Sequence, residues 1–232
     1  MPKVKRDQAP EAEYLRDLAE RLGDLLGQNL VGVYAGGSYA LGEYRRESSD
    51  LDVAAVVETA LDDRLKDSIA ARLRHESLPC PARGLELVAY RLETARSTGA
   101  DADFELNLNS GRAMELRVDR GPGSVAAHWF PIDRSILAEA GVAVSGPPAA
   151  EVFAGPAPEA LLPALLESIR WHRRAANRED AVANACRGLR FAIEGHWSSK
   201  REALRWARER GVDPSLDRIE ARLAELGQPV RR

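Results

Sequence analysis

The stretch at residues 32–57, "GVYAGGSYALGEYRRESSDLDVAAVV", decides how the rest of the chain is interpreted. An apolar run at its start ends in Gly36, Gly37 and Ser38, and the segment "LDVAAVV" at its end is typical of a buried strand. Two carboxylates, Asp50 and Asp52, interrupt that second apolar segment. Since a buried charge is costly unless it is paired, this pattern indicates a site at which a ligand or a cation compensates the cost.

The two aspartates are placed to act together. Side chains two residues apart point to the same face of a strand and stand roughly 6–7 Å apart at their bases. Glu86 repeats the pattern, because it lies between Leu85 and Leu87 in a third apolar run. Carboxylates this close repel each other, and a divalent cation removes that repulsion. Mg²⁺ prefers oxygen ligands and commonly binds carboxylates together with phosphate oxygens, so we predict a Mg²⁺ site at Asp50 and Asp52.

The glycines that precede the aspartates are suited to a phosphate group. Glycine allows the backbone to approach a ligand closely, and the N–H groups at a helix start favour an anion. Gly37 and Ser38 are therefore expected to contact phosphate about a dozen residues before the metal carboxylates. A Gly-Gly-Ser segment alone is more often a turn, and an aspartate pair alone is often a solvated strand end. The two features together are much more specific than either one.

Composition limits the class of protein. The chain has 232 residues, a net charge of −3 and no long basic run, which disfavours nucleic acid as a partner. Its two cysteines, Cys80 and Cys186, have no zinc-type spacing and are too few for a disulfide scaffold. The N-terminus lacks the apolar region of a signal peptide, and no apolar run approaches the ~18 residues of a membrane span. We therefore expect a cytoplasmic monomer without a membrane partner.

Helical and strand patterns alternate in the first 145 residues. The predicted helices are 11–27, 60–75 and 132–140, and the predicted strands are 30–37, 51–57 and 85–92, followed by a hairpin within 101–118. Thr59 is the expected N-cap of the second helix, and "NSGR" is the expected hairpin turn. This alternation predicts an α/β (α+β) domain with a mixed sheet at residues 1–145.

The strand signals stop beyond this point. Residues 141–160 are rich in proline, glycine and alanine and are interpreted as a connector. Four helical patterns follow, with a capping box at Ser199 and Glu202 and an N-cap at Asp213 before a proline. We therefore predict a linker at about 146–154 and an all-α helical bundle domain at 155–232.

The order Gly-Ser, a short spacer, then Ser-Asp-x-Asp in "GGSYALGEYRRESSDLDV" resembles the signature of the polymerase-β-type nucleotidyltransferases. Those enzymes transfer a nucleoside monophosphate from a nucleoside triphosphate and release pyrophosphate. The resemblance implies that Gly37 and Ser38 hold the triphosphate and that Ser49 lies near the phosphates. It also implies that Asp50 and Asp52 bind Mg²⁺, with Glu86 as the third carboxylate of the family.

The chain as a whole resembles the aminoglycoside adenylyltransferases of the streptomycin and spectinomycin type. "LELV" is similar to their third-carboxylate strand, which implies that Glu86 is the base that activates the acceptor hydroxyl. "IDRSILAEAGVAVSGPPAAEVF" is similar to the segment that enters their helical domain, which implies that Asp133 lies near the site. Arg187 and Lys200 keep the thirteen-residue spacing of a basic pair that contacts the phosphates of ATP.

The resemblance implies transfer of AMP from ATP to a hydroxyl of a small molecule, an aminoglycoside or aminocyclitol-like acceptor, as in antibiotic resistance. The acceptor stays open, because the stretch before Arg187 is dominated by basic residues that disfavour a polycationic drug: Arg170, Arg173, Arg174 and Arg178. A protein acceptor, or a catalytically silent nucleotide-binding relative, are the alternatives. His128 and Trp129 are interpreted as packing residues, and Trp197 and Trp206 as core residues.

Overall fold

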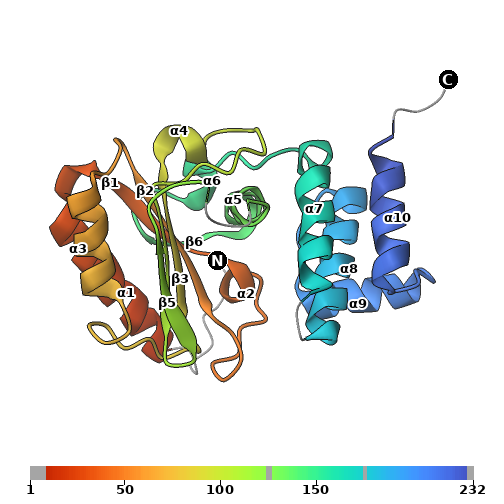
Figure 1. Cartoon of the computed structure of the whole chain (residues 1–232), viewed down its shortest axis with the longest axis horizontal. Coiled ribbons are helices and arrows are strands. Elements are labelled where there is room, and N and C mark those ends of the chain that lie inside the picture. Colours follow the sequence, from red (N-terminus) through yellow and green to blue (C-terminus); the bar gives the residue numbers. More distant parts are fainter. Residues whose placement is uncertain (1–8, 124–126, 175–176, 229–232) are drawn as a thin grey trace.

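The structure is a computed structural model, and it describes residues 9–123, 127–174 and 177–228. In this part of the chain a six-stranded sheet forms one half and a bundle of four helices forms the other (Figure 1). The strand order is β5-β4-β3-β2-β1-β6, and the neighbouring strands are antiparallel except for the parallel pair β2 and β3. The strands are β1 Leu30–Ala35, β2 Leu51–Val57, β3 Leu85–Arg91, β4 Leu106–Gly111, β5 Met114–Asp119 and β6 Val142–Ser145.

The parallel pairing of β2 with β3 brings two of the unusual carboxylates together. Asp52 lies directly beside Glu86 in the strand register. Each is the second residue of its strand, so both lie at the same edge of the sheet. Since paired residues of neighbouring strands point to the same face, these two side chains share one face of the sheet.

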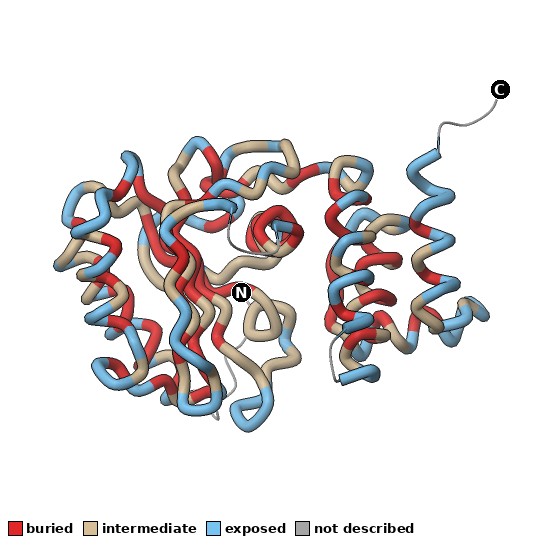
Figure 2. Tube along the Cα trace, viewed as in Figure 1, coloured by how far each residue is buried: buried red, intermediate tan, exposed pale blue. Residues whose placement is uncertain are grey.

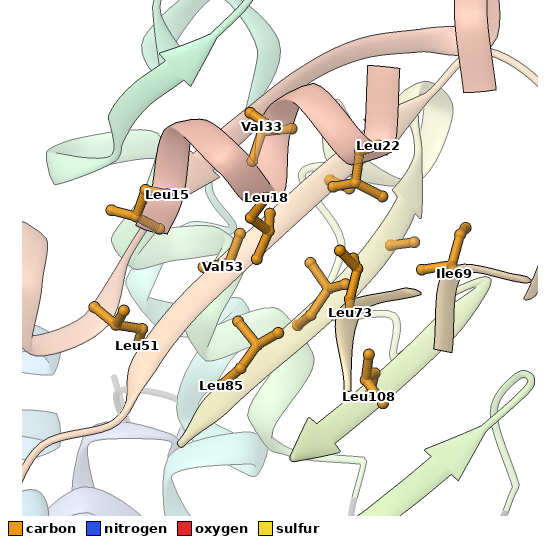
Figure 3. Close-up of a cluster of buried hydrophobic side chains, with 14 of the residues drawn as sticks. Leu15, Leu18, Leu22, Val33, Leu51, Val53, Ile69, Leu73, Leu85 and Leu108 are labelled. Carbon is orange, nitrogen blue, oxygen red and sulfur yellow. The ribbon is translucent and has the colours of Figure 1, made fainter. Parts of the chain in front are cut away.

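One face of the sheet is covered by α1 (Ala9–Leu26) and α3 (Asp63–Leu73), as Figure 1 shows. Leucines at helical spacing on α1 pack against the alternate strand residues Leu51 and Val53. Figure 3 shows this core, which is made of aliphatic side chains from both helices and four strands: Leu15, Leu18, Leu22, Val33, Leu51, Val53, Ile69, Leu73, Leu85 and Leu108. Leu51 and Val53 therefore face this core, on the side of β2 opposite to Asp52.

The other face of the sheet is covered by α5 (Trp129–Ala140) and α6 (Ala149–Val152). Beyond Asp52 and Glu86 this face becomes apolar, and its buried residues are Tyr34, Ala54, Val56, Val88 and Tyr90, packed against Phe130, Leu137 and Phe153. The carboxylates therefore occupy the end of an otherwise apolar surface. The short helices α2 (Gly37–Ala40) and α4 (Leu92–Ala95) and the 3-10 helix η2 (Gly27–Asn29) complete this half.

The C-terminal half consists of α7 (Pro158–His172), α8 (Arg178–Glu194), α9 (Lys200–Glu209) and α10 (Leu216–Leu226). These helices pack around their own buried apolar residues, and Figure 2 shows this second buried region. Among the described residues, no helix combines the length and the apolar character that a membrane crossing requires.

Helix α5 joins the two halves. Phe130 and Leu137 belong to the core on the sheet, whereas Ile132 and Ile136 belong to the core of the bundle. Polar contacts add to this connection: the indole N–H of Trp197 donates to Ser135 Oγ at 2.9 Å, and its backbone N–H donates to the Glu139 carboxylate at 2.8 Å. Arg201 of α9 also pairs with Glu43 at 2.8 Å. The bundle is therefore held at a defined position against the sheet.

The element types predicted up to residue 140 and the four later helices are confirmed, and so is the capping box at Ser199. The predicted cap Thr59 is wrong: Asp62 caps α3, while the backbone N–H and hydroxyl of Thr59 donate to Asn29. The hairpin turn lies at residues 112–113, so of the expected "NSGR" turn only Arg112 belongs to it, and the residues before it are part of β4. Likewise Ser215, and not Asp213, precedes α10; the Asp213 carboxylate accepts from the backbone N–H of Ser215.

The connector contains structure that its composition does not indicate. β6 pairs with β1 as an edge strand, and Ala149 and Val152 of α6 are buried against α5. We still propose domains at 1–145 and 155–232, and the linker at about 146–154 is then a packed segment rather than a free one.

Candidate active site

Asp52 and Glu86 form the centre of the site. Burial raises the pKa of each carboxyl group, and the negative charge of the neighbouring carboxylates raises it further. For Glu86 the contributing neighbours are Asp52, Asp50 and Asp133. These four carboxylates come from three separate segments of the sequence, and the structure brings them within electrostatic range of one another.

Arg83 is a site residue that the sequence analysis missed. It lies two residues before β3, and its guanidinium donates to both oxygens of Asp50 at 2.8 and 2.7 Å. Its side chain is 47% exposed, so it covers Asp50 from the solvent side. The parallel pairing of β2 with β3 is the signal that could have revealed it, because this register places the residue before Gly84 near Asp50. The backbone N–H of Arg83 donates to the Ser49 carbonyl at 3.2 Å, in agreement with that register.

The glycine segment lies directly on Asp52. The backbone N–H of Gly36 donates to the Asp52 carbonyl at 2.8 Å, and the backbone N–H of Ser38 donates to the Asp52 carboxylate. Gly37 has a φ of +50°, and a Cβ built there would lie 1.7 Å from Asp52 Oδ2. Glycine is therefore required at position 37, because another residue would have an unfavourable backbone conformation and would clash with Asp52.

Ser49 supports the loop before β2. Its hydroxyl oxygen accepts from the backbone N–H of Arg45 at 3.0 Å.

For the nucleotidyl transfer that the sequence resemblance implies, Gly37→Ala is expected to lower the rate about a hundred-fold. The new methyl group displaces the Asp52 carboxylate, and ångström-scale misplacement has costs of this size. The measurement is the steady-state rate of pyrophosphate release. Gly27→Ala is the matched control, because Gly27 has a φ of +52° and nothing within 4 Å of its Cβ position. The control carries the same backbone strain, so equal losses of activity in both variants would contradict the steric argument.

Two cations reach the site from the bundle. Arg187 of α8 and Lys200 of α9 both lower the pKa of Asp52, against the stronger effect of burial. Lys200 pairs with Asp180 at 2.6 Å, and the Arg187 guanidinium donates to Asn184 Oδ1 at 2.8 Å. The pair predicted from its spacing is therefore brought to the carboxylates rather than to a solvated helix face.

Asp133 completes the arrangement on α5. Burial raises the pKa of its carboxyl group to about 8, the charge of Asp52 raises it as well, and Arg187 opposes both effects. Asp133 therefore lies within electrostatic range of both Asp52 on the sheet and Arg187 on the bundle.

The donor set at Asp50 and Asp52 fits a divalent cation. Both side chains offer hard oxygen ligands. Burial, and then the charge of Asp50, raise the pKa of Asp52, and a bound cation would stabilise the ionised form that they disfavour. Among the described residues, no three histidine, cysteine or acidic side chains already converge as a complete metal site. A cation bound here would therefore take its remaining ligands from phosphate or water.

An aromatic cluster borders the site. It contains His128, Trp129, Trp171 and His172, with ring centroids 4.4 Å apart for His128 and Trp129 and 5.2 Å apart for Trp129 and Trp171. His128 is only 3% exposed, which confirms its interpretation as a packing residue; Trp197 and Trp206 are buried as predicted. Within the described part of the chain neither ring nitrogen of His128 has a hydrogen-bond partner.

His128→Phe is expected to remove part of the acid sensitivity of folding. Burial lowers the pKa of His128 to about 4, with a smaller contribution from His172, against 6.5 in the unfolded chain. Above pH 6.5 both states are neutral there. As the pH falls from 6.5 toward 4, only the unfolded chain takes up this proton, so the free energy of unfolding falls by about 1 kcal/mol per pH unit. Urea unfolding of both proteins at pH 8, 6 and 5 measures this, and parallel pH dependences would contradict it.

The basic stretch before Arg187 is less cationic than its sequence indicates. Arg170 pairs with Glu220 at 3.0 Å, and Arg173 pairs with Glu220 at 2.6 Å and with Asp217 at 2.5 Å. Both partners belong to α10. The packing of α7 against α10 therefore neutralises two of the four arginines and corrects the interpretation of this surface as strongly basic.

Comparisons with known proteins agree with this geometry. The nucleotidyltransferase domain family matches residues 15–85, which include the glycine segment and both aspartates and end one residue before Glu86. Among solved structures, the spectinomycin adenyltransferase AAD(9) from Enterococcus faecialis, crystallised with ATP and spectinomycin, is similar with a TM-score of 0.65. The identity is 18%, over 94% of this chain and 91% of that chain. No curated protein sequence matches the chain. The chain therefore carries a nucleotidyltransferase domain match at residues 15–85, and over nearly its whole length it has the fold that the spectinomycin adenyltransferase also has.

Proposed function

We propose that this enzyme transfers AMP from ATP to a hydroxyl group of an aminoglycoside or aminocyclitol-like small molecule and releases pyrophosphate. The observation that carries the proposal is that negative side chains of the sheet and positive side chains of the bundle converge on one site. Asp50, Asp52 and Glu86 lie on the sheet side, and Arg187 and Lys200 of the bundle act on the same carboxylate group. Phosphoryl transfer depends mainly on positioning and charge stabilisation, which this arrangement supplies.

The triphosphate lies, in this proposal, between the two halves of the molecule. Arg187 and Lys200 bind its oxygens from the bundle, and the Ser38 hydroxyl donates to it from the glycine segment. Ser49 and Asp133 lie at the borders of the same site. Asp50 and Asp52 would hold Mg²⁺, which when bound neutralises phosphate charge and polarises the reacting phosphorus centre.

Glu86 is the proposed general base. Its carboxyl pKa is raised by burial and by the neighbouring carboxylates, which makes its carboxylate a stronger proton acceptor than an exposed one. It accepts the proton of the acceptor hydroxyl as the oxygen attacks the α-phosphorus. Its place beside Asp52 supports this role, because a hydroxyl at Glu86 would then lie next to a nucleotide bound at Asp52.

An aminoglycoside-like acceptor is supported by the fold shared with the spectinomycin adenyltransferase. The arginine–glutamate and arginine–aspartate pairs between α7 and α10 also lower the positive charge that argued against a cationic drug. The second observation concerns the bundle, which in this proposal is the half that would contact the acceptor.

The test is pyrophosphate release from ATP and Mg²⁺, with and without streptomycin and spectinomycin, in the wild type and in Asp50→Asn. Release that depends on a drug and is lost in the variant is the expected result. Binding of ATP by calorimetry without drug-dependent release would keep the nucleotidyltransferase chemistry and exclude these acceptors. No binding of ATP, with or without Mg²⁺, would contradict the proposal as a whole.

A further inference from the structure

The partners of Arg187 are neutral. Its guanidinium donates to the amide oxygen of Asn184 at 2.8 Å and lies over the ring of Trp197, 5.8 Å from the ring centroid. Within the described part of the chain no carboxylate pairs with it within 4.0 Å, whereas Lys200 is paired directly with Asp180. Asp133, Asp52, Asp180 and Glu43 act on its charge only from longer range. Neutral direct partners hold a guanidinium in place without forming an ion pair, so its donors stay available for an anionic ligand.

The orientation of the Asn184 amide follows from its second partner. The Asn184 amide nitrogen lies 2.8 Å from Nε2 of His172, and Nδ1 of His172 lies 2.8 Å from the Ser168 carbonyl oxygen. A carbonyl only accepts, so Nδ1 carries the proton and Nε2 accepts from Asn184. The amide oxygen of Asn184 must then face Arg187.

His172 is held in this neutral form by its surroundings. It is buried, and burial is the main cause that lowers its pKa. The charges around it partly cancel: Asp180 raises its pKa, whereas Lys200 and Arg187 lower it, and His128 is a further titratable neighbour. A buried neutral histidine with both nitrogens satisfied is suited to orienting the group that it contacts.

We propose that Asn184 is a positioning residue for Arg187, and that His172 fixes the Asn184 amide so that the chain Ser168–His172–Asn184–Arg187 presents a fully charged guanidinium to the triphosphate. The inference rests on the proposed function, because it assigns Arg187 to the phosphates. It predicts that affinity for the nucleotide depends on neutral residues behind Arg187 that do not touch the ligand.

The experiment compares binding of ATP and of inorganic tripolyphosphate by calorimetry, together with steady-state kinetics. Asn184→Leu is expected to weaken both ligands about ten-fold or more, with the KM for the acceptor unchanged. Asn184→Asp keeps the hydrogen bond but pairs the charge of Arg187, so it is also expected to weaken both. Val182→Ala on the same helix, at a partly buried residue packed against the bundle core, is the control and is expected to bind like the wild type.

His172 supplies the second comparison. Glutamine at this position keeps one donor and one acceptor, so His172→Gln is expected to retain most of the affinity that His172→Leu loses. Equal affinity in Asn184→Leu and Val182→Ala would overturn the assignment of Asn184, and equal losses in the two His172 variants would overturn that of His172. If the wild type binds neither ATP nor tripolyphosphate, the proposed function itself fails, and the inference fails with it.

Discussion

Asp52→Asn is expected to lower nucleotidyl transfer by about a hundred- to a thousand-fold and to leave the fold intact. Asp52 receives the backbone N–H of Ser38, lies beside Glu86 and is the carboxylate on which the two bundle cations act. Replacing it removes a predicted metal ligand and the charge that organises this centre, and losses of this size follow when one electrostatic group is removed from an active site. The measurement is pyrophosphate release at saturating ATP and Mg²⁺.

The same Asp52→Asn substitution is expected to leave the stability of the folded protein unchanged or to increase it. The raised pKa of Asp52 means that its ionised form is disfavoured in the folded protein, because of burial and the charge of Asp50. Asparagine carries no charge, so the melting temperature of Asp52→Asn should equal or exceed that of the wild type at pH 8. A stabilised but inactive protein is the usual outcome when a strained functional group is neutralised. A variant with normal turnover would contradict the metal assignment, and an unfolded one would make Asp52 structural.

Glu86→Gln is the second variant with a large expected effect. Transfer is expected to fall by about a hundred- to ten-thousand-fold, because glutamine cannot accept the proton of the acceptor hydroxyl. ATP binding should be retained or slightly strengthened, since one negative charge is removed near the phosphates. Calorimetry with ATP and single-turnover transfer to the acceptor separate the two effects.

Glu93→Gln is the matched control for this variant. It makes the same change of charge on the exposed helix α4, where the side chain is 68% exposed and pairs with Arg91. It is expected to transfer AMP like the wild type. If Glu86→Gln loses ATP binding together with its cooperative unfolding transition, Glu86 supports the fold and is not the base.

The sheet and the carboxylates could be predicted because each depends on a local pattern. The strands are short apolar runs, and Asp50, Asp52 and Glu86 are conspicuous because they interrupt such runs. Alternation of side chains places Leu51 in the core and leaves Asp52 on the other face, as the structure has it. These inferences need only the geometry of a single strand.

The features that could not be predicted depend on long-range partners. Thr59 has the composition of an N-cap, but Asn29, thirty residues earlier, takes its hydrogen bonds and leaves the cap to Asp62. β6 has four residues inside a proline-rich segment, and only its pairing with β1 makes it a strand. A tertiary contact that overrides the local preference of a residue cannot be predicted from the neighbouring sequence alone.

The same reason explains the missed site residues. Arg83 is one arginine among many until the parallel register places it on Asp50. Asn184 is an ordinary polar helix residue until the packing of α7 against α8 puts His172 beside it. An acidic residue inside an apolar strand pattern stands out in the sequence, whereas a polar residue that supports the site through a tertiary contact does not.

Helix α5 belongs to two cores at once, and this limits how the protein can be divided or recombined. Ile132 and Ile136 are buried only because the bundle covers them, whereas Phe130 and Leu137 are buried by the sheet. A fragment that lacks the bundle would expose Ile132 and Ile136 to water. A bundle taken from another protein would have to pack against these two side chains. The half that carries the carboxylates is therefore not expected to fold independently of the bundle. New acceptor specificities are expected to arise by substitutions within the existing bundle rather than by replacement of the bundle.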